Sequence, residues 1–160
     1  MLFEATSLSE GRGTDEPFQL IGAPWIRAED LVAQMNELDL AGVHFEAASF
    51  SPRSIAEAAP SPRFEGELLY GVRIVVTDPS AVAGLEVGVH LLAAIIDHGA
   101  SVGISAATII DRPQVFDRLA GTTALRTALV AGDDVADLLA GFESEHGAFR
   151  NLIASVLLYE

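Results

Sequence analysis

A short glycine-containing segment near the start of the chain carries the side chains best suited to chemistry. It reads Ser9-Glu10-Gly11-Arg12-Gly13-Thr14. The two glycines allow the backbone to approach a ligand closely, and the Arg12 guanidinium can form paired hydrogen bonds with a carboxylate. Glu4 lies six positions before Glu10, so two carboxylates and a guanidinium could face one cleft. Glycoside hydrolysis uses two carboxylates that face a sugar ring.

The same segment also has a purely structural interpretation. Glu10 and Arg12 can neutralise one another in a tight loop whose glycines supply positive φ angles. The segment lacks the Gly-Lys-Ser/Thr of a phosphate-binding loop and does not match the GxGxxG fingerprint. Both interpretations stay open from the residues alone.

Few other side chains in the sequence point to catalysis. The chain has no Cys and no Lys, which excludes disulfides, thiolate ligands and Schiff-base chemistry. No two of its four His are three or four positions apart, so we expect no metal site and no cofactor. His44 is interpreted as a surface residue of a strand. Asp117 and Arg118 either pair with another segment or begin a solvated helix. We assign no catalytic residue.

Aromatic side chains offer a second kind of sugar contact. A flat ring can stack on the apolar face of a pyranose, and burial in the core is the competing interpretation, which we favour for most of these residues. The candidates are Trp25, Phe50, Phe64 and Tyr70.

Composition limits the class of protein. The 160 residues are 50% apolar and carry a formal charge of −14, which predicts one folded domain and disfavours nucleic acid and anionic membrane surfaces as partners. The most apolar stretch, residues 87–110, contains Asp97, so we interpret it as two buried elements separated at residues 97–99. The N-terminus lacks the basic residues and apolar run of a signal peptide, so a cytoplasmic location is the default.

The elements that must hold residues 9–14 follow from hydrophobic periodicity. We expect a strand-like opening at Met1–Ala5, an apolar run at Phe18–Trp25, a helix at Arg27–Leu40 and a strand at Val43–Phe50. A long proline-containing connection, residues 51–66, then leads to a further strand.

The second half of the chain is expected to be mainly helical. A central strand with apolar residues on both faces is predicted at Glu67–Thr77, and it carries Arg73. Asp78 and Pro79 are expected to begin a long helix that ends at Gly99. The remaining expected elements are a strand at 102–110 and helical segments at 116–121, 122–130, 133–139 and 142–158. Together they predict an α+β fold with a small mixed or barrel-like sheet packed against helices, and a helical C-terminal third.

The chain resembles the DUF1343 family, which includes exo-β-N-acetylmuramidases that act on peptidoglycan fragments. The likeness runs through the whole chain in order and spacing. Its motifs are residues 4–14, Pro17-Phe18, Ile21-Gly22-Ala23-Pro24-Trp25, Phe50-Ser51-Pro52, Tyr70-Gly71-Val72, Thr77-Asp78, Phe116-Asp117-Arg118-Leu119-Ala120-Gly121 and Leu157-Leu158-Tyr159.

The resemblance implies a particular place in a larger enzyme. Family members are about twice as long and pair a Rossmann-like N-terminal domain, which carries the catalytic acid, with a C-terminal auxiliary domain across a cleft. Residues 1–160 look like that auxiliary domain alone, with the Rossmann-like domain absent.

The resemblance also suggests roles for the loop. Arg12 would bind a carboxylate such as the lactyl group of a muramic acid. The other candidate substrate-binding residues would bond sugar hydroxyls or brace the loop: Glu4, Ser7, Ser9, Glu10 and Thr14.

Two departures from the family pattern leave the sugar open. The family usually has Glu-Gly-Thr-Asn where this chain has residues 4–7, so the Ser7 hydroxyl replaces an amide that could hold an acetamido group. The connection at residues 51–66 also differs and contains Arg53 and Arg63.

Two functions from different classes therefore compete. The first is a cleft-forming domain of a glycoside hydrolase for N-acetylmuramides, not catalytic alone. The second is a binding or assembly module that pairs with a separate catalytic half or with itself. A fragment that has lost its ligand also stays open.

Overall fold

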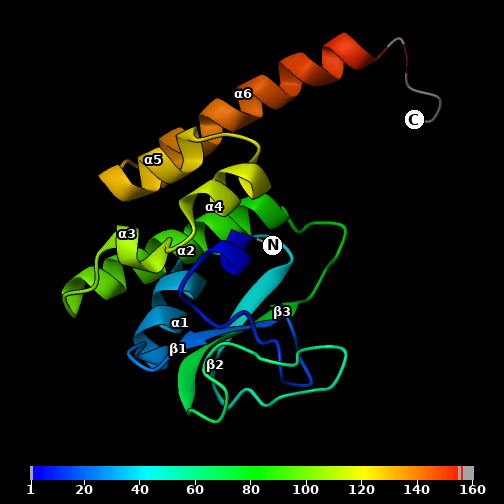
Figure 1. Ribbon diagram of the computed structural model, residues 1–160. Coiled ribbons are helices and arrows are strands. Elements are labelled where there is room, and N and C mark those ends of the chain that lie inside the picture. The colour runs from blue at the N-terminus through cyan, green and yellow to red at the C-terminus, as the bar shows by residue number, and fades with distance from the viewer. Residues whose placement is uncertain (1, 155, 157–160) are drawn as a thin grey trace.

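The computed structural model describes residues 2–154 and 156 and has an α+β fold (Figure 1). Three short strands form a sheet near one end of the molecule, and helices are stacked beyond it. The predicted fold class is therefore confirmed. Within the described residues the sheet contains antiparallel pairs only, where a mixed or barrel-like sheet was expected.

The sheet has the order β1-β3-β2, with β1 at Leu20–Ala23, β2 at Val43–Phe50 and β3 at Leu69–Val76. The expected strand at Val43–Phe50 is confirmed with the same bounds, and β3 takes the central place predicted for it. Alternate residues of each strand point to opposite faces, so the sheet has an inner face on the main core and an outer face. The inner face includes Ile21, Phe45 and Val72.

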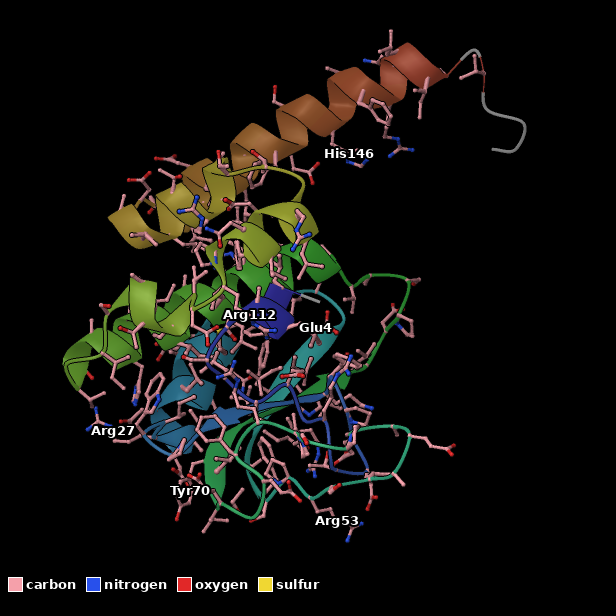
Figure 2. All side chains as sticks on the ribbon, viewed as in Figure 1. Glu4, Arg27, Arg53, Tyr70, Arg112 and His146 are labelled. Atoms are coloured by element: carbon pink, nitrogen blue, oxygen red, sulfur yellow. The ribbon has the colours of Figure 1, made fainter. Side chains whose placement is uncertain are left out.

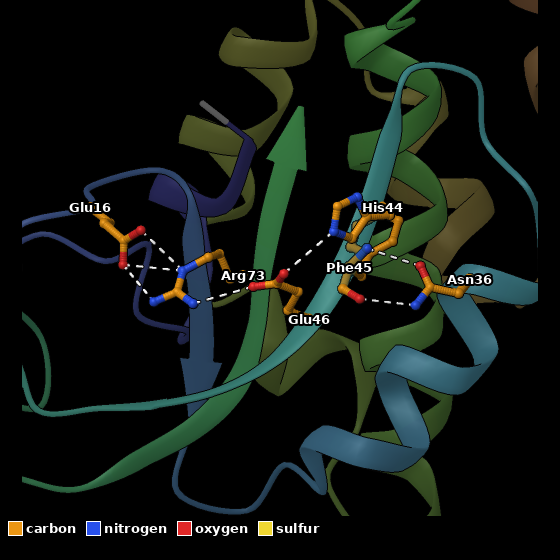
Figure 3. Close-up of polar contacts among 6 residues, drawn as sticks. All are labelled: Glu16, Asn36, His44, Phe45, Glu46 and Arg73. Carbon is orange, nitrogen blue, oxygen red and sulfur yellow. Dashed lines mark hydrogen bonds and ion pairs between the residues drawn. The ribbon is translucent and has the colours of Figure 1, made fainter. Parts of the chain in front are cut away.

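Arg73 lies on the outer face of the central strand and is held between two carboxylates (Figure 3). Its Nε and Nη2 atoms donate to Glu16 at 3.0 and 2.8 Å, and its Nη1 lies 3.4 Å from Glu46. These bonds, chiefly those with Glu16, raise the pKa of Arg73. Arg73 of β3 thereby links Glu16, in the segment before β1, to Glu46 of β2.

Two helices cover the inner face of the sheet. Helix α1 spans Ala28–Glu37 and buries Leu31 and Met35, as its periodicity predicts. Its Asn36 side chain bonds both the N–H and the C=O of Phe45 at 2.9 Å, which fastens the helix to β2 (Figure 3). Helix α2, Gly84–Ser101, is buried along much of its length and forms the centre of the core.

The last third of the chain is helical, as expected. Short helices α3 (Ala106–Ile109), α4 (Pro113–Ala120) and α5 (Ala124–Ala131) pack beside α2 and lead to α6 (Val135–Ile153). The Asp134 carboxylate accepts hydrogen bonds from the backbone N–H groups of Ala136 and Asp137 and so caps α6. Helix α6 extends past the rest of the molecule (Figure 1).

The opening of the chain is a 3₁₀ helix, η1, at Leu2–Ala5, so the prediction of a strand-like Met1–Ala5 was wrong for its described part. The Thr6 N–H and hydroxyl both donate to the Phe3 carbonyl and close the turn. Phe3 and Ala5 are buried, and η1 packs against α4. Burial rather than a strand ladder explains the apolar residues there, and Met1 lies outside the described residues.

The expected break at residues 97–99 was also wrong, because α2 continues through it to Ser101. Gly99 is a packing residue: a Cβ there would lie 2.7 Å from the Ile109 Cδ1 atom. Its place at the helix end is taken by Gly103, whose φ is +83°. The His98 side chain is buried, stacks on Trp25 and accepts a hydrogen bond from the Arg27 N–H at 3.1 Å.

Three further element predictions need correction. Asp78 does not cap α2: its carboxylate bonds the Ser80 N–H and hydroxyl in a turn, and α2 begins at Gly84. The expected strand at 102–110 is a loop followed by α3, whose first turn is capped by Ser105. The segments expected at 133–139 and 142–158 form the single helix α6, and residues 157–159 lie outside the described part of the chain.

None of the helices in residues 2–154 and 156 is long and apolar enough to cross a bilayer.

Candidate functional site

The loop at residues 9–16 is fastened to the fold at both ends. At its start, Ser9 pairs with Gly22 through two backbone hydrogen bonds of 2.9 and 3.0 Å, which extends the edge of the sheet beyond β1. At its end, Glu16 holds Arg73 of the central strand. In between, the Arg53 N–H donates to the Gly13 carbonyl at 2.9 Å, so the connection at 51–66 supports the loop from outside.

Both loop glycines are needed for this conformation. Gly11 and Gly13 have φ angles of +76° and +83°, which favour glycine. A Cβ on Gly13 would lie 2.5 Å from the Arg53 carbonyl oxygen, and one on Gly11 would lie 2.9 Å from two carbonyl oxygens. The backbone therefore turns sharply on each side of Arg12, as the sequence predicted.

The loop brings Arg12 together with both expected carboxylates. Its Nη2 donates to Glu4 Oε1 at 3.1 Å, and its Nε lies 3.4 Å from Glu10 Oε1. The guanidinium also lies over the ring of Phe18, 5.4 Å from the centroid, at cation–π distance. The Arg12 side chain stays 47% exposed. Because a guanidinium has five N–H donors, it can still donate to a ligand from this position.

The hydroxyl residues of the predicted site brace the loop. Ser9 is buried, and its Oγ accepts a hydrogen bond from the Gly11 N–H at 3.3 Å. Thr14 Oγ1 donates to the Gly11 carbonyl at 2.6 Å and accepts from the Glu16 N–H at 3.1 Å. Ser7 is half-buried, and its N–H donates to the Ile109 carbonyl at 2.7 Å. Sugar binding by these three residues stays a prediction.

A groove of about 370 Å³ begins beside the Arg12 cluster. Phe18 belongs to both, because its ring lies under the guanidinium and also lines the groove. The groove is lined mainly by apolar side chains of η1, β3, α2 and α4, among them Phe3, Ile74, Val87 and Leu119. The Arg12 cluster and the apolar groove are thus joined through the Phe18 ring.

Sequence reasoning missed Phe18 as a site residue. It has a φ angle of +66°, which is uncommon for a residue with a bulky side chain, and it remains 44% exposed. Its N–H donates to the Glu10 carbonyl at 2.7 Å, so the loop fixes its conformation. The available signals were its position two residues after the loop and its place in the Pro17-Phe18 motif.

A second group of charged residues continues from Glu4, and sequence reasoning missed it too. The Arg112 guanidinium donates to the Glu4 carbonyl, and the Arg112 N–H donates to the Ala5 carbonyl at 3.3 Å (Figure 2). Neighbouring Asp111 accepts from Arg63 at 3.1 Å. Arg63 and Asp111 are 48 positions apart in sequence, so only the fold brings these groups to one edge.

The aromatic candidates do not gather around Arg12. Phe50 is buried, in a small cluster on the outer sheet face, and Phe64 is packed against that cluster. Trp25 stacks on His98. Tyr70 is exposed and lies well away from Glu4 (Figure 2). We favoured burial for most of these rings, and Phe50 is indeed buried. The aromatic ring that contacts Arg12 is that of Phe18.

The remaining candidates have structural partners. Asp117 makes two hydrogen bonds of 2.8 Å with Arg126 of α5, so it pairs with another segment as one of the two interpretations held. Arg118 bonds the Gln114 carbonyl in its own helix. His44 is on the exposed side of β2, as expected. Across residues 2–154 and 156, no group of three or more metal-ligating side chains comes together.

One protein-family model matches nearly the whole chain. Residues 1–159 match the family model described as "Exo-beta-N-acetylmuramidase NamZ, C-terminal". One relative is the "Peptidoglycan beta-N-acetylmuramidase NamZ" of Bacillus subtilis (strain 168), which is 34% identical over 158 residues. That match covers 99% of this chain and 35% of the relative, so the chain spans about a third of that protein's length.

Two solved structures share the fold. Both are crystal structures of DUF1343 family proteins from Bacteroides fragilis NCTC 9343, labelled BF0371 and BF0379. The first has a TM-score of 0.78 at 22% sequence identity, and the match covers 99% of this chain and 40% of that one. The second has a TM-score of 0.64 at 25% identity, with 99% and 38% covered.

Proposed function

This chain belongs to the family of NamZ C-terminal domains, and we propose that it forms one wall of a saccharide cleft in an N-acetylmuramidase. Its ligand would be an amino sugar or peptidoglycan fragment that carries a carboxylate. The catalytic acid would lie on a separate Rossmann-like domain. The B. subtilis relative, by its name, acts on peptidoglycan as a β-N-acetylmuramidase.

One observation carries this proposal: Arg12 is held in place by the loop and yet remains 47% exposed, over the ring of Phe18, which lines an apolar groove. Arginine recognises carboxylates through paired, charge-assisted hydrogen bonds. Muramic acid differs from glucosamine by a lactyl ether that carries a carboxylate, so a fixed arginine can distinguish the two. Glu4 and Glu10 orient the guanidinium and can accept hydrogen bonds from sugar hydroxyls.

A loop with a purely structural role could contain the same ion pairs between Arg12 and the carboxylates of Glu4 and Glu10. Exposed ion pairs add little to stability, with a median of about 0–1 kcal/mol. Stability alone therefore gives a weak reason for a guanidinium that a two-glycine turn brings between two carboxylates. Pre-organisation for a ligand gives a stronger one, because a fixed side chain loses little entropy on binding.

The chain should supply binding without turnover. The Arg12 cluster holds two carboxylates, but both bond the same guanidinium, so their geometry serves to orient Arg12. A glycosidase needs a protonated carboxylic acid at the leaving oxygen. We therefore place that acid on the other domain.

A chimera tests the proposal directly. The segment of the B. subtilis relative that matches this chain is replaced by residues 1–160, and hydrolysis of a chromogenic β-N-acetylmuramide is measured. We expect turnover by the chimera and none by the 160-residue chain alone. Arg12→Ala in the chimera should lower kcat/KM by roughly 10- to 100-fold, mainly through KM, because a charge-assisted bond to the bound sugar is lost.

Two variants act as controls in the chimera. Arg27→Ala removes another exposed arginine, at the start of α1 and far from Glu4 (Figure 2), and should leave the kinetics unchanged. Glu10→Gln tests whether the catalytic acid is here after all. Turnover by the chain alone that disappears in Glu10→Gln would contradict the proposed division of roles, as would full activity of the Arg12→Ala chimera.

A further inference from the structure

Helix α6 carries a mainly apolar stripe, and the later part of it is exposed where the helix extends past the body of the molecule. Leu139, Phe142, His146, Phe149 and Ile153 follow one another at spacings of three, four, three and four, which places them on one stripe of the helix. Leu139 and Phe142 pack against the core. Further along, Phe149 is 57% exposed, and neighbouring Leu152 is 77% exposed.

The first half of the same stripe borders a groove. A hollow of about 610 Å³ lies between α6 and the start of α2, lined by Leu85 of α2 and by Phe142 and His146 of α6. Leu85 itself is 52% exposed. One helix thus presents both a hollow with an apolar wall and, about two turns further on, projecting apolar side chains.

Charged side chains beside the stripe follow a similar pattern, with acidic residues at the groove and an arginine near the projecting apolar side chains. Glu143 and Glu86 line the groove. Arg150 follows Glu143 by seven positions, so the two lie on the same side of the stripe, two turns apart. When two such helices run antiparallel, Arg150 of each comes to lie beside Glu143 of the other.

We propose that two copies of this chain associate through α6 in an antiparallel, two-fold arrangement. Phe149 and Leu152 of each copy fill the groove beside Phe142 and Leu85 of the other. Arg150 of each copy pairs with Glu143 of the other. A two-fold interface is self-complementary, which is what a helix with a groove in one half and projecting side chains in the other provides.

A parallel pairing fits these features less well. It would leave both grooves empty and bury only the projecting ends. Leu85 lines both this groove and the groove beside Phe18, but the Arg12 cluster itself lies on other elements, so the inference does not rest on sugar binding. An experiment that contradicts the dimer does not contradict the sugar site, and the reverse also holds.

Sedimentation equilibrium of the 160-residue chain over about 10–500 µM is the first test. We expect a reversible dimer. Phe149→Ser and Leu152→Ser should each weaken the association at least tenfold, because both remove apolar contact from the groove. Val102→Ser, which changes an exposed apolar residue after α2 and away from α6, is the matched control and should associate like the unchanged chain.

Charge reversal distinguishes a second copy from any other occupant. Glu143→Arg and Arg150→Glu should each weaken the dimer, because each places like charges opposite one another. The double variant Glu143→Arg/Arg150→Glu should restore it, since every pair is again of opposite sign. Restoration requires that both residues of the pair come from copies of this chain.

Engineered cysteines test the orientation, since the natural chain has none. In the antiparallel arrangement His146 faces Phe149 of the other copy. A mixture of His146→Cys and Phe149→Cys chains should therefore form mixed disulfide dimers faster than either variant alone. Self-linking of His146→Cys alone would indicate parallel helices and overturn the proposal.

Two other results would overturn it. One is a chain that stays monomeric at every concentration. The other is a double charge variant as weak as the single ones. If the monomeric chain instead binds the separately produced N-terminal part of the B. subtilis relative, and Phe149→Ser abolishes this, the groove belongs to that domain.

Discussion

Gly13 is the residue on which the position of Arg12 depends most directly. Its left-handed backbone turns the chain immediately after Arg12, and its carbonyl accepts the hydrogen bond from Arg53 that supports the loop. The side-chain contacts of Arg12 with Glu4 and Glu10 exist only while this turn is kept.

Gly13→Ala should therefore lower the free energy of unfolding by roughly 2–5 kcal/mol, from strain at positive φ and from overlap with the Arg53 carbonyl. Gly66→Ala is the matched control: φ there is +78°, but no atom lies within 4 Å of the added Cβ, so about 1 kcal/mol is expected. Urea denaturation measures both. Equal losses for the two variants would show that the Gly13 turn is not sterically constrained.

Single residues also show the limit of sequence reasoning. Spacing alone indicated that Glu4, Glu10 and Arg12 could meet, and they do. Phe18 escaped because nothing in its type marks a positive φ angle. Arg112 escaped because its contact with Glu4 joins segments more than a hundred positions apart, which only the tertiary fold determines.

Strands and helices that depend only on the pattern of a few consecutive residues were predicted well. The alternation in β2 and the helical period in α1 are properties of a few consecutive residues, so the bounds of the first are reproduced and those of the second differ by a few residues. Helix α2 was divided wrongly at residues 97–99 because Gly99 was interpreted as a helix end. Its absent side chain instead makes room for Ile109, a partner that periodicity does not reveal.

The link between α4 and α5 makes stability depend on pH. Two hydrogen bonds from Arg126 lower the pKa of Asp117 below its ordinary value. A carboxyl whose pKa is lower in the folded state adds stability above its unfolded pKa, and this stability is lost as the pH falls through the folded pKa.

Asp117→Asn should consequently destabilise the chain at pH 7, and the difference from the unchanged chain should shrink below about pH 4. Chemical denaturation at a series of pH values measures this. In an Arg126→Met background the same Asn substitution should have a much smaller effect at pH 7, because the partner is already gone. A difference that stays constant from pH 7 to pH 2.5 would contradict the role given to the pair.

At the scale of the whole molecule, the two candidate surfaces adjoin at Leu85, which lines both the groove beside Phe18 and the groove beside α6. The Arg12 cluster lies where η1, the loop before β1 and the groove at α2 and α4 meet. The apolar stripe of α6 overhangs the opposite end of the helical layer from the sheet (Figure 1). A chain of net charge −14 gathers three of its nine arginines, Arg12, Arg63 and Arg112, around Glu4 and Asp111.

This concentration of arginine fits a ligand that carries a carboxylate better than a neutral sugar. The rest of this acidic surface repels an anion. Binding of a carboxylate must therefore come from short-range hydrogen bonds to fixed guanidinium groups. Affinity should therefore depend strongly on the carboxylate of the sugar and on Arg12.

Titration of the isotope-labelled chain with N-acetylmuramic acid, followed by amide chemical shifts, tests this most directly. We predict shifts concentrated at residues 10–14 and at Phe18, much weaker shifts with N-acetylglucosamine, which lacks the lactyl carboxylate, and none at these positions in Arg12→Ala. Equal responses to both sugars, or an unchanged response in Arg12→Ala, would contradict a saccharide wall built around this arginine.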